Sequence, residues 1–228
     1  MKAAPTVSDP AARRKIFIVD DHPLVREWLA SVIGRETDLE ICGQADSAAT
    51  ALQNLPAARP DAIVVDLSLG ASSGLELIKD LRLQFSGLLI LVLSMHEEVT
   101  FAERAFRAGA HGYVVKRESG SRVIEALRAV LAGQFYTSPA LASQIAGRLF
   151  GAGGRAVGSP SELLSDREME VFQQRGAGRS VKEIAEFLHV SVKTVESYEA
   201  RIKEKLGLKN AAELIRAAVR WNDRQHGV

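Results

Sequence analysis

Short apolar runs alternate with longer amphipathic stretches along the first half of the chain. The apolar runs occupy residues 15–19, 39–45, 62–65, 88–94 and 112–115, and four of the five lack the alternation of a half-exposed strand. Stretches of helical periodicity follow them at residues 23–34, 47–55, 74–85, 99–109 and 121–133. Continuous apolar strands are typical of a parallel sheet that helices cover on both faces. The pattern therefore predicts five βα units that form a doubly wound α/β domain with a five-stranded parallel sheet.

The pattern changes after Gly133, where no further strand is indicated. Residues 138–150 form one more amphipathic stretch, and the ten residues after it contain four Gly and one Pro, which is typical of a flexible linker. From Ser161 onward the chain is helical in pattern, with N-cap signals at Ser165 and Asn210, each followed three residues later by Glu. We therefore expect a disordered tail over residues 1–14, an α/β domain over 15–134, a linker over 135–160 and an all-α domain over 161–228.

Composition narrows the class of protein. Of the 228 residues, 46% are hydrophobic and 25% charged, which is enough apolar material for real cores. The net charge of +1 neither demands nor excludes nucleic acid. Cys42 is the only cysteine, so an intrachain disulfide and a Cys-based zinc site are excluded, and a reducing compartment fits. Leu88 to Leu93 is too short for the ~20 residues of a membrane span, and the N-terminus lacks an apolar signal core. We expect a cytoplasmic protein with no membrane partner.

Polar side chains stand at the carboxyl ends of four of the predicted strands: Asp20 and Asp21, Asp66, Ser94 and Lys116. Such strand ends meet in one crevice of an open α/β sheet. Carboxylates brought together repel each other unless a cation joins them, and an oxygen-rich site suits Mg²⁺ or Mn²⁺. An Asp beside such a metal can attack phosphorus and form an aspartyl phosphate, with Lys116 and Ser94 on its oxygens. Each residue alone is equally well explained as a helix cap or turn residue; their joint placement favours a site.

The stretch 178–206 has the pattern of a helix-turn-helix. Apolar stripes fit two short helices that a tight turn at residues 189–191 joins. The outward face of the second helix suits DNA, with Lys193 able to reach guanine and Glu196 able to accept from cytosine N4. The candidate DNA-binding residues are Lys182, Lys193, Thr194, Glu196, Ser197, Arg201 and Lys205. A helical protein-binding domain remains an alternative, because residues 160–228 hold twelve basic and eleven acidic residues.

These motifs resemble a known family. "VDDHPLVRE", "VVDLSLGASSGLEL", "LVLSMHEE" and "AGAHGYVVKRES" are similar to a CheY-like, flavodoxin-like receiver domain. "LSDREMEVFQQRGAGRSVKEIAEFLHVSVKTVESY" with "IKEKLGL" resembles the LuxR/NarL-type DNA-binding domain almost end to end. The chain is thus similar to two-component response regulators of the NarL/FixJ type.

The resemblance implies a role for each residue at the strand ends. Asp66 would be the phosphoacceptor, and Asp21, Asp66 and the backbone carbonyl of Ser68 would hold the metal, with Asp20 acting through a metal-bound water. Ser94 and Tyr113 would be the switch pair, and Lys116 would contact the phosphoryl group. Two positions depart from the family: Gly70 stands where proline is usual, and Glu199 where a basic residue is common. Ser68 and His96 stand at positions that influence how fast the phosphoryl group hydrolyses, and an exposed loop residue explains His96 better than a catalytic role does. We expect Glu199 to form a pair within its own domain.

The implied function is phosphorylation-dependent transcriptional regulation. A sensor histidine kinase would donate to Asp66, and the receiver would control promoter DNA binding by a homodimer, with RNA polymerase as a further partner. The chain would catalyse its own phosphotransfer and slow dephosphorylation without being a turnover enzyme. Three alternatives stay open: an Asp-nucleophile phosphohydrolase, a receiver that works without phosphorylation, and a protein-interaction output in place of DNA. For the last helix, with Leu214, Ile215, Ala218 and Trp221, an intradomain core and a dimer contact are about equally supported.

Overall fold

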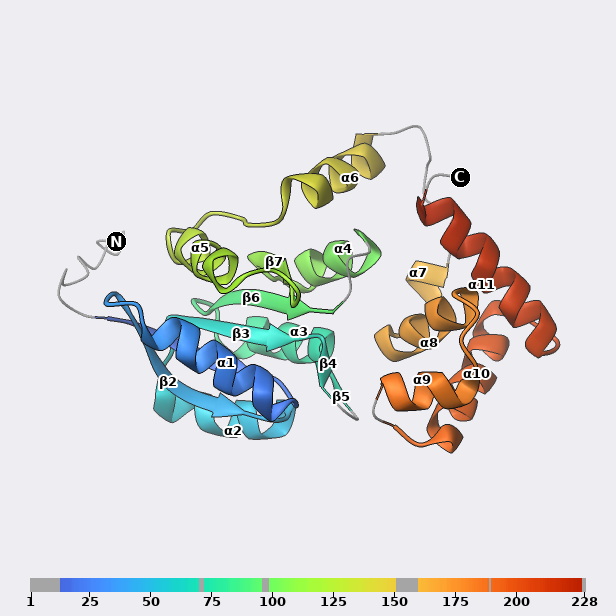
Figure 1. The fold of residues 1–228 in the computed structure, drawn as a ribbon, viewed down its shortest axis with the longest axis horizontal. Helices are drawn as coiled ribbons and strands as arrows, with labels where there is room; N and C mark the ends of the chain where they lie inside the picture. The colour runs from blue at the N-terminus through green and yellow to red at the C-terminus, as the bar shows by residue number, and fades with distance from the viewer. Residues whose placement is uncertain (1–12, 70–71, 96–98, 151–159, 189, 227–228) are drawn as a thin grey trace.

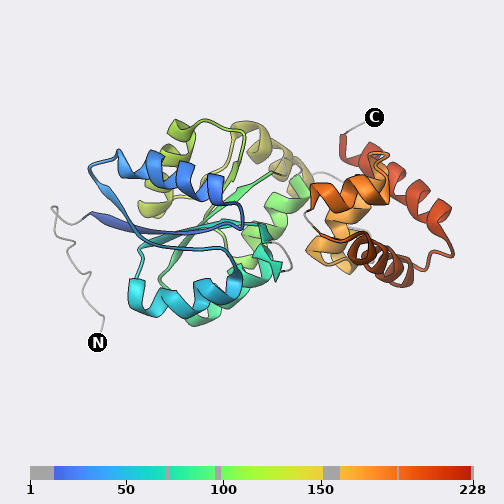
Figure 2. The same cartoon turned by 60° about the horizontal axis from the view of Figure 1, so that its bottom comes forward.

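The computed structural model describes residues 13–69, 72–95, 99–150, 160–188 and 190–226. They form an α/β lobe, blue to green in Figure 1, and a helical lobe, orange to red, that lies beside the carboxyl-terminal edge of the sheet in both views (Figures 1 and 2). Gly70, His96 and the Gly-rich segment 151–159 lie outside the described residues, as do residues 1–12, so the expectations for them stay predictions. Within the described ranges, no helix combines the length and apolarity that crossing a bilayer requires.

The α/β lobe contains the predicted sheet of five parallel strands: β1 (Arg14–Val19), β2 (Leu39–Ala45), β3 (Ala62–Asp66), β6 (Leu89–Ser94) and β7 (Gly112–Val115). Their order is β2-β1-β3-β6-β7. In this flavodoxin-like order, the chain moves outward from β1 on both sides, which creates a crevice between β1 and β3. The predicted fold class is confirmed.

Helices cover both faces of the sheet, which explains the continuous apolar strands. α1 (Pro23–Gly34) and α5 (Gly120–Leu131) lie on one face, and α2 (Ala48–Ala58), α3 (Gly74–Gln84) and α4 (Val99–Ala108) lie on the other. Along β3, Val64 packs toward α1 and α5, whereas Ile63 and Val65 pack toward the opposite helices. All three side chains are fully buried, since a central strand has no solvent-facing side.

A short hairpin after Asp66 was not predicted. β4 (Ser68–Leu69) pairs antiparallel with β5 (Ser72–Ser73), and α3 begins directly after it at Gly74. The Gly74 backbone N–H donates to the Leu67 carbonyl at 2.9 Å. A Cβ at Gly74 would collide with the Asp66 carbonyl oxygen and with Leu67 Cα. The hairpin was missed because two-residue strands carry too little periodicity to be read from sequence.

The linker helix and the helical lobe follow. α6 (Pro139–Phe150) packs on α4 through the buried Leu141. The helical lobe consists of α7 (Pro160–Leu163), α8 (Asp166–Gly176), α9 (Val181–Phe187), α10 (Val192–Leu206) and α11 (Ala211–His226). Side chains of Ser165, Ser180, Ser191 and Asn210 accept N-terminal backbone N–H groups of α8, α9, α10 and α11. Each such cap stabilises a helix by about 1 kcal/mol, and the predicted caps at Ser165 and Asn210 are confirmed.

The last helix contributes to the core of its own lobe. Leu214 and Ala218 are fully buried, and Trp221 packs partly buried against the same cluster. The Asn222 side chain donates to the Gln173 carbonyl at 3.0 Å, which joins α11 to α8. The intradomain interpretation therefore holds for Leu214, Ala218 and Trp221. Ile215 is half-buried, and a dimer contact by the remaining faces of α11 stays a prediction.

Candidate functional site

The predicted carboxylates meet because the strands end level with one another. Val19 lies opposite Val65 across β1 and β3, Asp66 lies opposite Leu93 across β3 and β6, and Ser94 lies opposite Val115 across β6 and β7. Asp20, Asp66 and Ser94 are almost fully buried, at 1%, 1% and 0% exposure. We call Asp20, Asp21, Asp66 and Lys116 the acidic pocket. It lies at the crevice that the fold places at this edge of the sheet.

Lys116 bridges the two buried carboxylates. Its Nζ lies 2.7 Å from Asp66 Oδ2 and 2.7 Å from Asp20 Oδ2. The Lys116 backbone N–H donates to the Ser94 carbonyl at 2.7 Å, which fixes the start of its side chain. A buried carboxylate is stable only when it is paired or hydrogen-bonded, and Lys116 supplies that pairing for both.

Burial and charge shift the ionisation of this group. Burial raises the pKa of Asp66 to about 6, while Lys116 acts to lower it and Asp20 to raise it further. Burial alone would lower the pKa of Lys116, but the carboxylates of Asp66 and Asp20 outweigh it and raise that pKa. The raised pKa of Asp66 thus reflects mainly its burial, with a smaller contribution from the neighbouring Asp20 carboxylate.

The residues present fit a divalent metal ion. One ligand atom each from Asp20, Asp21, His22 and Asp66 lie within 4.8 Å of one another. Asp66 Oδ1 is buried and accepts no hydrogen bond within the described part of the chain. A buried carboxylate oxygen normally has a partner, and a metal ion would supply one. Three carboxylates form a hard-oxygen donor set, which suits Mg²⁺ or Mn²⁺.

His22 is a member of the site that sequence reasoning missed. Its Nδ1 lies 2.7 Å from Asp21 Oδ1 and 3.3 Å from Asp20 Oδ1, and its backbone N–H donates to Asp20 Oδ1 at 2.9 Å. The Arg26 side chain donates to the Asp20 carbonyl at 2.6 Å. The sequence did hold a signal for His22, because this residue directly follows Asp21 and precedes the first helix. These contacts orient the two carboxylates toward Asp66.

The remaining predicted receiver residues lie around the acidic pocket. Tyr113 is on β7, opposite Val92, and its side chain is 1% exposed within the core. Ser94 closes β6, so both predicted switch residues are interior and one strand apart. Ser68 begins β4, two residues after Asp66, and its hydroxyl donates to Glu170 of the helical lobe at 2.9 Å. Sequence reasoning did not foresee this contact between lobes.

The outward face of α10, made of Lys193, Glu196, Ser197 and Arg201, is exposed to solvent. These four residues were predicted from sequence, and the exposed Lys182 on α9 was predicted with them. Thr194 is half-buried, and its hydroxyl shares a 2.8 Å hydrogen bond with that of Ser191. A shallow pocket of about 360 Å³ lies on this face between Ser191 and Arg201. The helix-turn-helix geometry and its candidate reading face are therefore both present.

Two charged residues of α10 form ion pairs within the helical lobe. Lys205, predicted to contact DNA phosphate, has its Nζ 2.6 Å from Glu168 Oε2 in the capping box of α8. Because this pairing joins α10 to α8, Lys205 has a structural partner that the sequence did not indicate. Glu199 pairs with Arg175, Oε1 to Nε at 2.7 Å, which confirms the predicted intradomain pair.

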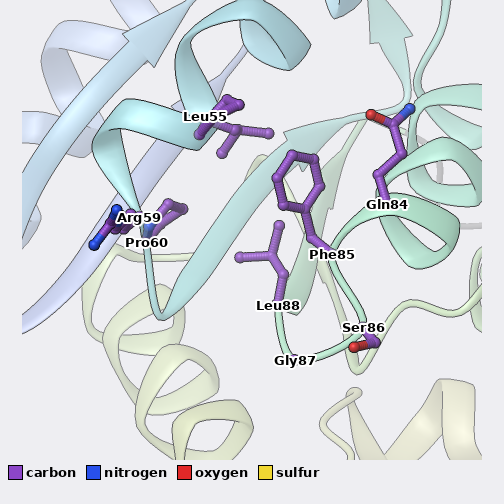
Figure 3. A pocket seen from close by; sticks show the side chains of 9 residues that line it. Leu55, Arg59, Pro60, Gln84, Phe85, Ser86, Gly87 and Leu88 are labelled. Carbon is purple, nitrogen blue, oxygen red and sulfur yellow. The ribbon is translucent and has the colours of Figure 1, made fainter.

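A second hollow lies at the opposite edge of the sheet. It measures about 410 Å³ and is lined by Leu55, Pro60, Phe85 and Leu88 together with the side chain of Arg59 (Figure 3). It sits where α2 and α3 end and β3 and β6 begin. Polar groups of Arg59, Gln84 and Ser86 share its walls with the apolar side chains, and Arg59 is the one ionisable residue among those that line it. The acidic pocket is thus the better candidate for chemistry.

Comparison with known proteins identifies both lobes. The response regulator receiver domain matches residues 16–128, and the luxR family of bacterial regulatory proteins matches residues 162–218. Response regulator GacA of Pseudomonas syringae pv. syringae (strain B728a) is 34% identical over 206 residues, which cover 90% of this chain and 95% of GacA. The DNA-binding transcriptional activator DevR/DosR of Mycobacterium tuberculosis (strain ATCC 25618 / H37Rv) is 34% identical over 199 residues, which cover 87% of this chain and 91% of that protein.

A solved structure shares the same two-lobed plan. The structure of two RcsB dimers bound to two parallel DNAs is 25% identical to this chain, with a TM-score of 0.57. It covers 91% of this chain and 98% of the RcsB chain. The sheet order, the acidic pocket, the helix-turn-helix and these similarities agree, and the chain belongs to the NarL/FixJ family of two-component response regulators.

Proposed function

We propose that Asp66 accepts a phosphoryl group from the phosphohistidine of a sensor kinase. The observation that carries this proposal is the buried Asp66 carboxylate, with Oδ2 on Lys116 and Oδ1 left for a metal ion. One Asp66 oxygen attacks phosphorus as the phosphorus–nitrogen bond of the donor breaks, and the imidazole leaves with the bonding pair and takes up a proton. Lys116 neutralises charge on the phosphoryl oxygens.

Asp21, Asp66 and the Ser68 backbone carbonyl would hold the metal, with Asp20 acting through water, and the metal would supply positive charge near the phosphoryl oxygens. The proposed metal is Mg²⁺ or Mn²⁺. Ser94 would donate a hydrogen bond to a phosphoryl oxygen, and Tyr113 would move with it. The phosphoryl group then biases two existing conformations through its different contacts in each.

The output of the receiver is proposed to be promoter DNA binding by a homodimer. DevR/DosR, at 34% identity, is a DNA-binding transcriptional activator, and RcsB, at 25% identity, is solved as dimers on DNA. The exposed outward face of α10 supports DNA binding. Lys193 and Glu196 would contact bases, and Arg201 and Lys182 would contact phosphate. Because a transcriptional regulator acts at promoters, RNA polymerase is a further proposed partner. The proposed location is the cytoplasm, where the protein can meet both the sensor kinase and DNA.

The experiment is phosphoryl labelling of the intact chain with acetyl phosphate and a divalent metal, followed by intact mass. We expect one added phosphoryl group on the wild type and on Asp80→Asn, which alters an exposed carboxylate of α3. Asp66→Asn should lose the label, since an amide cannot form the acyl phosphate. A label retained on folded Asp66→Asn would contradict the assignment, and sustained turnover of small phosphomonoesters would favour the phosphohydrolase alternative.

A further inference from the structure

The helical lobe forms one wall of the pocket that holds Asp66. A cavity of about 360 Å³ opens over the carboxylate, between the two lobes. The receiver contributes Asp21, His22, Val25, Asp66, Ser68, Met95 and Lys116 to its lining. The helical lobe contributes Arg167 from the first turn of α8, and Glu186, Phe187 and Leu188 from the end of α9. The helical lobe therefore lines part of the open space above Asp66.

Two sets of polar contacts hold this wall in place. On one side, Ser68 Oγ donates to Glu170 Oε1 at 2.9 Å. On the other, Asp166 Oδ1 lies 2.7 Å from the Arg104 guanidinium of α4, and Asp166 Oδ2 accepts from Ser73 Oγ at 2.8 Å. Asp166 and Glu170 are 7% and 1% exposed, so both carboxylates are shielded from solvent. Contacts of this kind are stronger than exposed pairs and add orientation to the docking.

The docked arrangement does not cover the DNA-reading face. Lys193, Glu196, Ser197 and Arg201 on the outward face of α10 are all exposed, whereas Asp66 is 1% exposed. In Figure 1, α8 and α9 face the hairpin β4–β5 and the sheet edge, and α10 belongs to the same lobe. In this geometry the helical lobe lies beside Asp66 and leaves the outward face of α10 exposed.

The size of the cavity separates two classes of phosphodonor. A small acyl phosphate occupies only a few water volumes of ~30 Å³ each and fits the space. A helix with its side chains is ~10 Å across. A helix that carries phosphohistidine must bring a surface of that width over Asp66, where Arg167, Phe187 and Leu188 of the helical lobe already line the cavity. A protein donor would also need to rest on the pocket rim, where Phe187 and Glu186 lie.

We infer that the docked helical lobe selects the phosphodonor by size: small acyl phosphates reach Asp66 in the docked form, and a protein-borne phosphohistidine reaches it only after undocking. The inference rests on the proposed role of Asp66. With the small donor, an Asp66 oxygen attacks phosphorus, the phosphorus–oxygen bond to the acyl group breaks, and a carboxylate leaves. With the protein donor, the phosphorus–nitrogen bond breaks and imidazole leaves. Residues that anchor the lobe, Arg104 above all, thereby determine donor specificity.

The test compares two donors on full-length variants. Arg104→Glu places a like charge against Asp166 and weakens docking without touching the acidic pocket. The matched control is Arg107→Glu on the same helix, since Arg107 pairs at 3.6 Å with Glu103 inside the receiver. The small donor is acetyl phosphate with Mg²⁺. The large donor is the autophosphorylated histidine-bearing core of a sensor kinase, taken from a panel as the one that transfers fastest to Arg104→Glu.

We expect Arg104→Glu to accept phosphoryl from the kinase core about tenfold faster than wild type, since the undocked fraction sets the apparent rate. Its labelling by acetyl phosphate should stay within about twofold of wild type, and Arg107→Glu should match wild type with both donors. The charge swap Arg104→Glu with Asp166→Arg should restore the slow kinase rate.

Three results would overturn the inference. Equal acceleration with both donors would mean that undocking changes the chemistry of Asp66 and not its accessibility. An unchanged kinase rate in folded Arg104→Glu would mean that docking does not limit access. A kinase rate that stays fast in the charge-swapped variant would mean that the Arg104–Asp166 pair does not control access to Asp66. The proposed function fails separately, when acetyl phosphate labels neither wild type nor variants, or still labels Asp66→Asn.

Discussion

The acidic pocket draws its side chains from the ends of separate strands, whereas the outward face of α10 belongs to a single helix. In the pocket, charges are buried and held by one another, as Lys116 is between Asp20 and Asp66. On α10, Lys193 and Arg201 remain in solvent. Buried charges interact strongly and depend on their partners, and exposed charges interact weakly until a ligand arrives. The same substitution type should therefore have very different effects in the two regions.

The largest expected effect comes from removing the cation of the pocket. Lys116→Met leaves two buried carboxylates without their ion pair and should lower the free energy of unfolding by about 3 kcal/mol, because unpaired buried charges are costly. Added Mg²⁺ should recover part of the loss. Urea denaturation with and without Mg²⁺ measures both. Lys193→Met, an exposed lysine, should unfold like wild type; a similar loss in both variants would remove the contrast between the regions.

The next effect concerns the backbone beneath the pocket. Gly74→Ala places a methyl group against the Asp66 carbonyl and Leu67 Cα, so the loop must shift. We expect a loss of about 1–3 kcal/mol in unfolding free energy and slower labelling by acetyl phosphate. Gly87→Ala is the control, since a Cβ there meets no atom within 4 Å. Normal stability and labelling of Gly74→Ala would show that the hairpin tolerates displacement.

On α10 the expected effect is on binding and not on stability. Lys193→Ala should weaken duplex binding by about 1–3 kcal/mol if it reads a base, with relaxed preference at one position, and its unfolding should be unchanged. Fluorescence anisotropy with duplexes at several salt concentrations separates the two roles, because losing a phosphate contact makes the salt dependence of binding less steep, whereas losing a base contact does not. Lys209→Ala, at an exposed position before α11, is the control. Equal losses in both variants would argue against a reading role for Lys193.

The smallest effect is a pH dependence in the helical lobe. Burial would raise the pKa of Glu168, but Lys205 and Ser165 outweigh it and hold that pKa below its ordinary value of 4.5. A lowered folded-state pKa means that Glu168 stabilises the fold above pH 4.5 and that this contribution is lost as the pH falls through the folded-state value. Thermal melts should show a shallower acid loss for Glu168→Gln than for Glu204→Gln, which alters an exposed residue. Parallel acid profiles would mean that the capping box contributes nothing through charge.

Local signals accounted for most of what was predicted correctly. The strand ends at Asp20, Asp66 and Lys116 could be located because continuous apolar runs stop there, and parallel strands bring their carboxyl ends together. The caps at Ser165 and Asn210 depend on residues only three positions apart. His22 and the hairpin β4–β5 were missed, since one residue or two carry no period.

What the sequence by itself determined is the set of elements and the chemistry at their ends. Apolar periodicity, caps and charge placement act over a few residues, and they sufficed for the five-stranded sheet, the acidic pocket and the exposed face of α10. Only the tertiary structure decided that Ser68 and Glu170, 102 residues apart, are hydrogen-bonded, that Lys205 pairs with Glu168, and that the end of α9 lines the cavity beside Asp66. The reason is that docking between lobes depends on shape and on pairs of distant charges, and neither leaves a periodic trace in the chain.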